Sequence, residues 1–172
     1  MIKQLYIGLG SNLGNRLDYL QTATGLLAES LGTLKLSSVY ETAPVGYVNQ
    51  NSFLNMAVSA ETDLDISRIH AVTRQIEYIL GRQRVVKWGP RIIDIDILLI
   101  GSLIYKSDDL EIPHPEMLKR RFVLEPLCEI DDSIPVPPDM RPVKDYLVSV
   151  MDQELKVFVS KESRNTKLLY PL

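Results

Sequence analysis

The 172-residue sequence has one cysteine, two histidines and one tryptophan. A single thiol can form neither an internal disulfide nor a thiolate metal site, which excludes disulfide-stapled and zinc-thiolate classes. Cys128 lies in an apolar stretch and is expected to be a buried, unreactive thiol. The sequence also lacks an apolar run long enough to cross a bilayer, and its first residues enter a strand-like pattern rather than an apolar leader. We therefore expect a cytoplasmic protein with no membrane partner.

An excess of positive charge is absent as well. The net charge is −3 and the pI is about 5.4, so no nucleic-acid partner is expected. The basic residues nevertheless gather in two short stretches, at positions 82–91 and 119–121. Two local basic clusters on an acidic protein indicate a small anionic ligand.

Hydrophobic periodicity predicts six regular elements in the first hundred residues. These are a strand at 5–9, a helix at 17–31 ending at Gly32, strands at 34–40 and 53–61, a helix capped by Asp65 and ending at Gly81, and a strand at 92–100. The β-α-β-β-α-β order favours an α+β class, a ferredoxin-like sandwich whose antiparallel sheet carries its helices on one face.

Beyond Gly101, repeated prolines predict irregular structure with short helical turns. A helix at 143–150 and a strand at 155–159 are expected to follow. No internal repeat or low-complexity segment divides the chain, so we expect one domain, 1–172, in which residues 151–172 form a C-terminal tail.

Segment 92–98 carries the strongest chemical signal, because two aspartates alternate there with isoleucines. Alternate side chains of a strand share a face, so Asp94 and Asp96 point the same way, with Cα atoms roughly 6.6 Å apart. Two such carboxylates can hold one hard cation or bridge two. The alternative is an internal ion pair, with Arg91 compensating carboxylates that would be costly on an apolar strand.

The basic loop before this strand favours the metal interpretation. It contains more cations than two carboxylates need: Arg82, Arg84, Lys87 and Arg91. Guanidinium groups suit phosphate oxygens, and a carboxylate pair beside such a loop is typical of a magnesium–nucleotide site.

Four other features give weaker signals. Trp88, beside a Gly-Pro pair, has the ring to cover a flat heteroaromatic ligand. His114, held between two prolines, favours a ligand contact, whereas His70 is expected to be a surface or packing residue. The Gly-rich stretch 8–14 fits neither the dinucleotide fingerprint nor the P-loop and is interpreted mainly as a strand-to-helix turn.

The run at 87–98, KWGPRIIDIDIL, resembles the signature of the 6-hydroxymethyl-7,8-dihydropterin pyrophosphokinase family of folate biosynthesis. Residues 10–14 resemble its first loop, 41–46 its second loop and 53–55 the start of its third strand. Residues 113–115 and 120–127 resemble its C-terminal signature. Several ordered motifs at matching spacing make the resemblance specific, and it extends to about Pro142.

The resemblance implies a ferredoxin-like fold and transfer of the β,γ-diphosphate of ATP to the pterin hydroxymethyl oxygen, with release of AMP. It implies catalytic roles for Arg82, Arg91, Asp94 and Asp96, the aspartates binding two Mg²⁺ ions. It implies ATP contacts for Glu77, Arg84, Lys87, Ile97, His114 and Arg120. It implies a pterin pocket formed by Thr42, Pro44, Val45, Phe53, Asn55, Trp88 and Phe122, in which Phe53 and Phe122 sandwich the ring.

Lys87 stands where the family more often has arginine, and Asp108, Asp109 and Glu111 receive no role. The chain is expected to be a monomer, with a dimer through the tail as the alternative. Three other functions remain open: a nucleotide-dependent transferase with another acceptor, a non-catalytic anion-binding module, and a dinucleotide oxidoreductase. The glycine spacing and the element order argue against the last.

Overall fold

The computed structural model describes residues 1–44, 49–82 and 89–163. Four predicted site residues lie outside these described residues, namely Val45, Arg84, Lys87 and Trp88.

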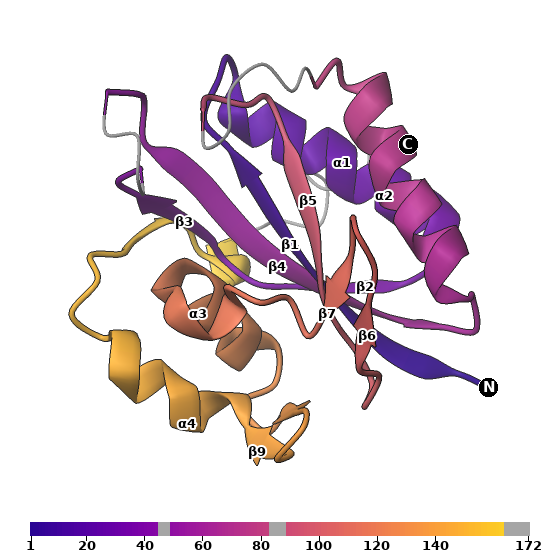
Figure 1. Ribbon diagram of the computed structural model, residues 1–172. Coiled ribbons are helices and arrows are strands. Elements are labelled where there is room, and N and C mark those ends of the chain that lie inside the picture. Colours follow the sequence, from indigo (N-terminus) through magenta and orange to yellow (C-terminus); the bar gives the residue numbers. More distant parts are fainter. Residues whose placement is uncertain (45–48, 83–88, 164–172) are drawn as a thin grey trace.

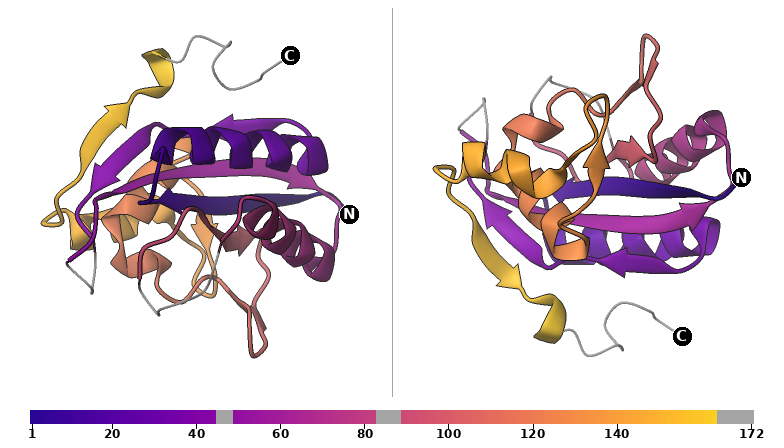
Figure 2. Two further views of the ribbon diagram at one scale, coloured as in Figure 1. Left: turned by 90° about the horizontal axis from the view of Figure 1, so that it is seen from above. Right: turned by 90° about the horizontal axis from the view of Figure 1, so that it is seen from below.

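An antiparallel sheet forms the centre of the molecule (Figure 1). Its three long strands are β1 (Lys3–Ser11), β4 (Phe53–Thr62) and β5 (Asp94–Ile100). Strand β1 lies between the other two and pairs antiparallel with both. Shorter strands extend the sheet beyond β4: β2 (Leu34–Leu36), β3 (Val39–Thr42) and, at the edge beside β3, β10 (Lys156–Val159) (Figure 2).

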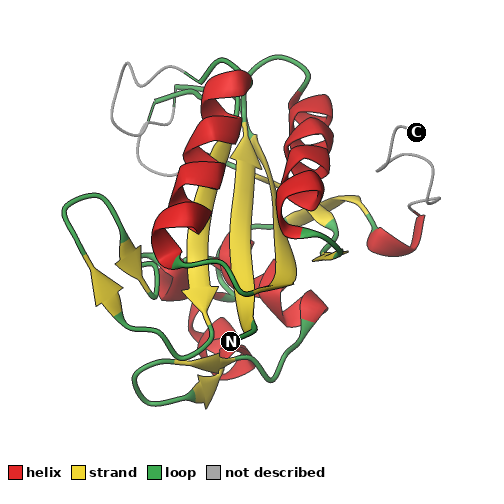
Figure 3. Ribbon diagram, turned by 90° about the vertical axis from the view of Figure 1, so that its right-hand side faces the viewer, coloured by secondary structure: helices red, strands yellow, loops and turns green. Residues whose placement is uncertain are grey.

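Helices cover both faces of this sheet. The long helices α1 (Arg16–Leu31) and α2 (Ile66–Ile79) lie side by side over one face (Figure 3). There they bury alternate residues of the strands, such as Leu5, Ile7 and Leu9 of β1. The other face carries α3 (Arg121–Ile130) and α4 (Val143–Leu147), packed in a second cluster with Tyr6, Ala57 and Leu98. The period-two pattern of the strands therefore serves two separate cores.

The predicted ferredoxin-like arrangement is confirmed, with its two long helices on a single face. The expected strand at 34–40, however, is divided at Ser37 and Ser38. The Ser38 amide donates to Glu129 Oε2 of α3 at 2.6 Å instead of to a neighbouring strand. This hydrogen bond to a side chain of helix α3 interrupts the expected strand, so that two shorter strands, β2 and β3, form in its place.

Helix α3 was not predicted, because Pro126 lies inside it. Proline removes one helical hydrogen bond, here to the Phe122 carbonyl, which makes an interior proline a poor sign of a helix. Burial of Leu124 and Leu127 against the sheet compensates for that loss. Cys128 in the same helix is half-buried, and burial raises the pKa of its thiol to about 11, consistent with the unreactive thiol expected.

Apart from α3, the described residues beyond β5 (101–163) form short elements, as the prolines predicted. Two small hairpins are present, β6 (Tyr105–Lys106) with β7 (Glu111–Ile112) and β8 (Pro135–Val136) with β9 (Arg141–Pro142). Three 3₁₀ turns cover Met117–Lys119, Val148–Val150 and Lys161–Ser163. None of the helices in the described residues is long and apolar enough to cross a membrane.

Asp65 caps α2 as predicted, since its side chain accepts a hydrogen bond from the Arg68 amide at 2.8 Å. We expect Asp65→Ala to lower the free energy of unfolding by about 1 kcal/mol, the usual effect of removing an N-cap. Urea denaturation followed by circular dichroism measures this. Asp63→Ala, an exposed aspartate two positions earlier, is the matched control. Equal destabilisation by both substitutions would assign the effect to charge rather than to the cap.

Candidate active site

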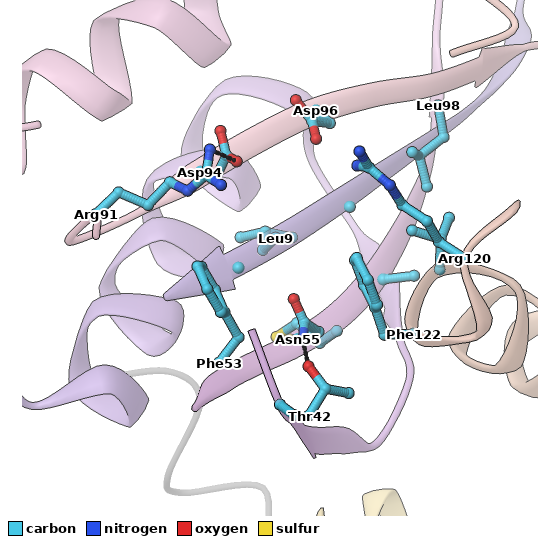
Figure 4. A pocket seen from close by; sticks show the side chains of 16 residues that line it. Leu9, Thr42, Phe53, Asn55, Arg91, Asp94, Asp96, Leu98, Arg120 and Phe122 are labelled. Atoms are coloured by element: carbon cyan, nitrogen blue, oxygen red, sulfur yellow. Dashed lines mark hydrogen bonds and ion pairs between the residues drawn. The ribbon is translucent and has the colours of Figure 1, made fainter. Parts of the chain in front are cut away.

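The alternation of strand β5 separates its acids from its apolar side chains. Ile95 and Ile97 are buried against the α1–α2 face. Asp94 and Asp96 point to the opposite face, together with Leu98 (Figure 4). The prediction that both aspartates share a face is therefore confirmed.

Asp94 is held by two arginines that flank the basic loop. Its Oδ1 lies 2.7 Å from Arg82 Nη1 and its Oδ2 lies 2.8 Å from Arg91 Nη1. The side chains of all three residues are at most 23% exposed, so the charges are little screened by water. The internal ion pair considered from the sequence thus exists at Asp94. It also brings both predicted catalytic arginines to the carboxylate.

Asp96 is far less satisfied than Asp94. Within the described part of the chain, its one ion pair is a 3.8 Å contact with His114 Nε2. Burial, followed by the neighbouring Asp94 carboxylate, raises the pKa of Asp96 to about 7. Among the described residues, this carboxylate therefore makes no ion pair shorter than 3.8 Å.

Glu77 lines the polar pocket described below and is also bound by protein groups. It is 4% exposed on α2 and pairs with Arg82 and, at 3.2 Å, with Arg74. Its Oε1 also accepts a hydrogen bond from the Ile95 amide at 3.0 Å. Glu77 therefore ties Arg82 to strand β5, and its carboxylate is already engaged by protein groups.

His114 faces the aspartates from the chain after β7. Its amide donates to the Leu98 carbonyl at 2.9 Å, and its Nδ1 accepts from the Glu116 amide at 3.2 Å. Burial, followed by the nearby Arg120 charge, lowers the pKa of His114 below its ordinary value. A neutral ring whose Nδ1 is an acceptor carries its proton on Nε2, which is the atom facing Asp96.

Asn12 joins two loops of the site, a role that the glycine-rich pattern around it did not reveal. It is fully buried, and its Nδ2 donates to Gln50 Oε1 and to the Asn51 carbonyl at 3.0 and 3.2 Å. Its Oδ1 accepts from the Arg91 amide at 2.7 Å. In the described structure the Arg91 Nε is buried with no hydrogen-bond partner.

A first pocket opens beside the aspartates, between β3, β4 and α3 (Figure 4). The Phe53 and Phe122 rings flank it from opposite sides, as the resemblance implied. Between them, Asn55 donates from Nδ2 to Thr42 Oγ1 at 2.8 Å, which leaves its oxygen directed into the pocket. A side chain at Gly10 would meet that oxygen, since a Cβ there would lie 3.0 Å from Asn55 Oδ1.

A second and more polar pocket adjoins the first. Predicted nucleotide contacts line it, among them Glu77, Ile97, His114 and Arg120. The two pockets share four residues, namely Arg91, Asp94, Asp96 and Arg120. The charged residues therefore stand at the boundary between a pocket flanked by aromatic rings and a polar pocket.

Several lining residues were missed or misjudged from the sequence. His70, expected to be a surface or packing residue, lines the second pocket. The spacing of His70, Thr73, Arg74 and Glu77 along α2 marks one helical face and was the available signal. The three unassigned acids of the β6–β7 hairpin, Asp108, Asp109 and Glu111, line the same pocket. Pro44 lines neither pocket, whereas its neighbour Ala43 lines the first.

A metal could be held here only with help from a ligand. No group of three or more His, Cys, Asp or Glu side chains suited to a metal occurs within residues 1–44, 49–82 and 89–163. Two carboxylates leave most of an octahedral magnesium shell to other oxygens. Phosphate and water oxygens commonly complete such a shell, so this donor set suits a metal that arrives with a phosphorylated substrate.

Comparison with known proteins agrees with this geometry. Residues 6–132 match the model of the family described as 7,8-dihydro-6-hydroxymethylpterin-pyrophosphokinase (HPPK). The 2-amino-4-hydroxy-6-hydroxymethyldihydropteridine pyrophosphokinase of Bacillus subtilis is 50% identical over 127 residues, which cover 73% of this chain and 76% of the relative. The enzyme of the same name from Aquifex aeolicus is 39% identical over 142 residues, covering 83% and 89%.

A solved structure supports the fold. The Plasmodium falciparum HPPK-DHPS wild type, with pterin and p-hydroxybenzoate, matches with a TM-score of 0.68 at 17% identity, covering 87% of this chain and 42% of that one. The chain belongs to the 7,8-dihydro-6-hydroxymethylpterin-pyrophosphokinase family, the pyrophosphokinases of folate biosynthesis.

Proposed function

We propose that this site transfers the β,γ-diphosphate of MgATP to the hydroxymethyl group of 6-hydroxymethyl-7,8-dihydropterin, giving AMP and the pterin diphosphate. The observation that carries the proposal is the meeting of two unlike pockets at one charged boundary. Arg91, Asp94, Asp96 and Arg120 line both pockets. Direct transfer between two substrates requires such a junction, because the reacting oxygen and phosphorus must be held close together.

The first pocket is the proposed acceptor site. In this proposal a flat pterin ring lies between Phe53 and Phe122, which line the pocket, and the Asn55 oxygen accepts from an N–H on the ring edge. The Arg91 and Arg120 guanidiniums lie 5.4 and 5.8 Å from the centroids of the Phe53 and Phe122 rings respectively. Each proposed stacking ring is therefore next to a cation that also reaches the second pocket.

The second pocket is the proposed nucleotide site. Arg82, Arg91, His114 and Arg120 line it and carry N–H groups suited to the oxygens of a triphosphate. Glu77 acts through Arg82, which it holds in place, rather than through the nucleotide. The nucleotide roles of Arg84 and Lys87, and the pterin roles of Val45 and Trp88, stay predictions from the resemblance.

Asp94 and Asp96 are the residues that would hold magnesium. Their shared face and the weak pairing of Asp96 fit two ions brought by the ATP phosphates. Bound magnesium would neutralise phosphate charge as the bond to the departing AMP breaks. Arg82 and Arg91, released in part from Asp94 by the metal, would then face the transferred group.

The chain's own contribution is alignment and charge. The pterin hydroxymethyl oxygen attacks the β-phosphorus, the bond from that phosphorus to the oxygen bridging it to the α-phosphate breaks, and AMP leaves with that oxygen. The hydroxymethyl proton is lost to solvent. A phosphoryl-type transfer of this kind needs little covalent participation from protein, in keeping with a site that pairs cations and carboxylates around a polar pocket.

A product assay with ATP, magnesium and the dihydropterin, resolving AMP from ADP, tests the proposal. We expect AMP and the pterin diphosphate in equal amounts, formed only when the pterin is present. ADP would mean transfer of a single phosphate. ATP binding without any product would favour a non-catalytic module or a different acceptor.

Asp96→Asn should reduce kcat at least about 100-fold, because a neutral amide cannot hold the metal that compensates phosphate charge. The melting temperature without magnesium should be unchanged or higher, since a poorly paired carboxylate is replaced by an uncharged group. Steady-state kinetics and thermal melts measure both. Asp63→Asn is the control for loss of one exposed negative charge. Normal turnover of Asp96→Asn would defeat the metal assignment.

Arg91→Ala should lower kcat by about 100-fold while changing the KM for ATP less than about fivefold. The reason is that Arg91 lines both pockets, and at that boundary it would stabilise the group in transit more than the bound nucleotide. Arg68→Ala, on the exposed side of α2, controls for loss of charge. An unchanged kcat with only a raised KM for ATP would contradict this role.

Asn55→Leu should raise the KM for the pterin roughly tenfold and leave the KM for ATP nearly unchanged, since the lost oxygen lies in the first pocket only. Thr42→Val should have a smaller effect in the same direction, because it removes the 2.8 Å contact that orients the Asn55 amide but keeps that amide. If ATP affinity fell as much as pterin affinity, the assignment of the two pockets would be wrong.

A further inference from the structure

Residues 151–163, the described part of the C-terminal tail, contact two elements that line the first pocket, β3 and α3. The family model matches residues 6–132 only, so this segment lies outside the matched part. Strand β10 pairs with β3, which carries Thr42, while Gln153 contacts the start of α3, which carries Phe122. A segment beyond the family match thus supports two elements of the proposed acceptor pocket.

Helix α3 lacks a cap from its own N-terminal residues. Arg120 is at the N-cap position and makes no capping hydrogen bond with its side chain. The first amides of a helix have no partner within the helix. Gln153 supplies one instead: its Oε1 accepts from the Arg121 amide at 2.9 Å, and its Nε2 donates to the Lys119 carbonyl at 2.8 Å. One side-chain amide therefore satisfies two backbone groups at the helix start.

The contact is reciprocal. Arg121 Nη1 donates to the Met151 and Gln153 carbonyls at 3.1 and 2.9 Å. Its Nε is held by Glu125 Oε2 at 3.0 Å, one turn further along α3. Because the Arg121 side chain is only 20% exposed, these bonds are partly shielded from water. The backbone at 119–121 and the backbone at 151–153 are consequently fixed to each other from both sides.

The residues next to this junction are those that form the pocket. Phe122 follows Arg121 directly and supplies one of the two flanking rings. Arg120, the residue directly before Arg121, lines both pockets. A backbone shift at 120–122 would move the Phe122 ring relative to Phe53, which is on a different element, β4.

We propose that Gln153 is a positioning residue for the acceptor: by binding the backbone on both sides of Arg120, its amide fixes the Phe122 ring against which the pterin stacks. The inference rests on the proposed function, because it concerns the proposed acceptor pocket. It assigns a specific task to a tail residue that lies outside residues 6–132, the part matched by the family model.

Three full-length variants test it. Gln153→Leu removes both hydrogen bonds at similar size. Gln153→Glu keeps the acceptor for the Arg121 amide and loses the donor to the Lys119 carbonyl. Gln21→Leu on α1 is the matched control, since Gln21 is also half-buried, lines neither pocket, and its side chain makes no hydrogen bond to another described residue.

The readout is equilibrium binding of fluorescent 6-hydroxymethylpterin in the presence of magnesium and α,β-methylene-ATP, together with separate KM and kcat values. Gln153→Leu should raise the Kd of the pterin about fivefold, and Gln153→Glu should raise it less. The Kd of the nucleotide analogue should rise clearly less than that of the pterin, because Arg120 adjoins this junction whereas Arg82, Arg91 and His114 hold the analogue from other elements. Gln21→Leu should match the wild type.

Equal pterin affinity in wild type, Gln153→Leu and Gln21→Leu would overturn the inference while leaving the proposed function intact. A drop in melting temperature with equal loss of pterin and nucleotide affinity would also overturn it, since that pattern indicates general destabilisation. A wild-type protein that fails to bind the pterin would defeat the proposed function itself, and this inference with it.

Discussion

The site depends on the need to compensate carboxylates on an otherwise apolar strand. Asp94 is satisfied by Arg82 and Arg91, which come from the two ends of the basic loop. Glu77 adds a second acid that holds Arg82 and the β5 backbone together. Breaking a partly buried ion pair lowers the free energy of unfolding more than losing an exposed pair does. These contacts therefore hold the two ends of the loop against the sheet. In the described part of the chain Asp96 makes no ion pair shorter than 3.8 Å, and we infer that its charge is available to a ligand.

The two-sided sheet explains why this charge lies between two pockets. One face of β1, β4 and β5 is filled by α1 and α2, so its strand residues are committed to the core. On the other face α3 covers only part of the sheet, and glycines replace large side chains where the first pocket opens. Gly10 is the clearest case, because a Cβ there would press on the Asn55 oxygen. The cavity thus follows from small residues on the face opposite the main core.

Local patterns predicted the parts of this structure that depend on local geometry. The alternation in β5, the Asp65 cap and the ferredoxin-like order follow from strand and helix periods. Helix α3 was not predicted because Pro126 lies in its interior, where a proline normally argues against a helix. The helix is stabilised by apolar side chains that pack against strands far away in the sequence. Hydrogen bonds between residues far apart in the sequence define three further roles. Glu77 and Ile95 are 18 positions apart, and Gln153 and Arg121 are 32 positions apart. Asn12 and Arg91 are separated by 79 positions. No local pattern encodes such contacts.

The central claim is that the two pockets hold the two substrates on either side of Asp94 and Asp96. A crystal structure with magnesium, 6-hydroxymethylpterin and α,β-methylene-ATP, whose α–β linkage cannot be cleaved, tests it most directly. We expect the pterin between Phe53 and Phe122, the triphosphate in the second pocket, and magnesium bound by both aspartates. A pterin bound elsewhere, or a metal held without Asp96, would contradict it.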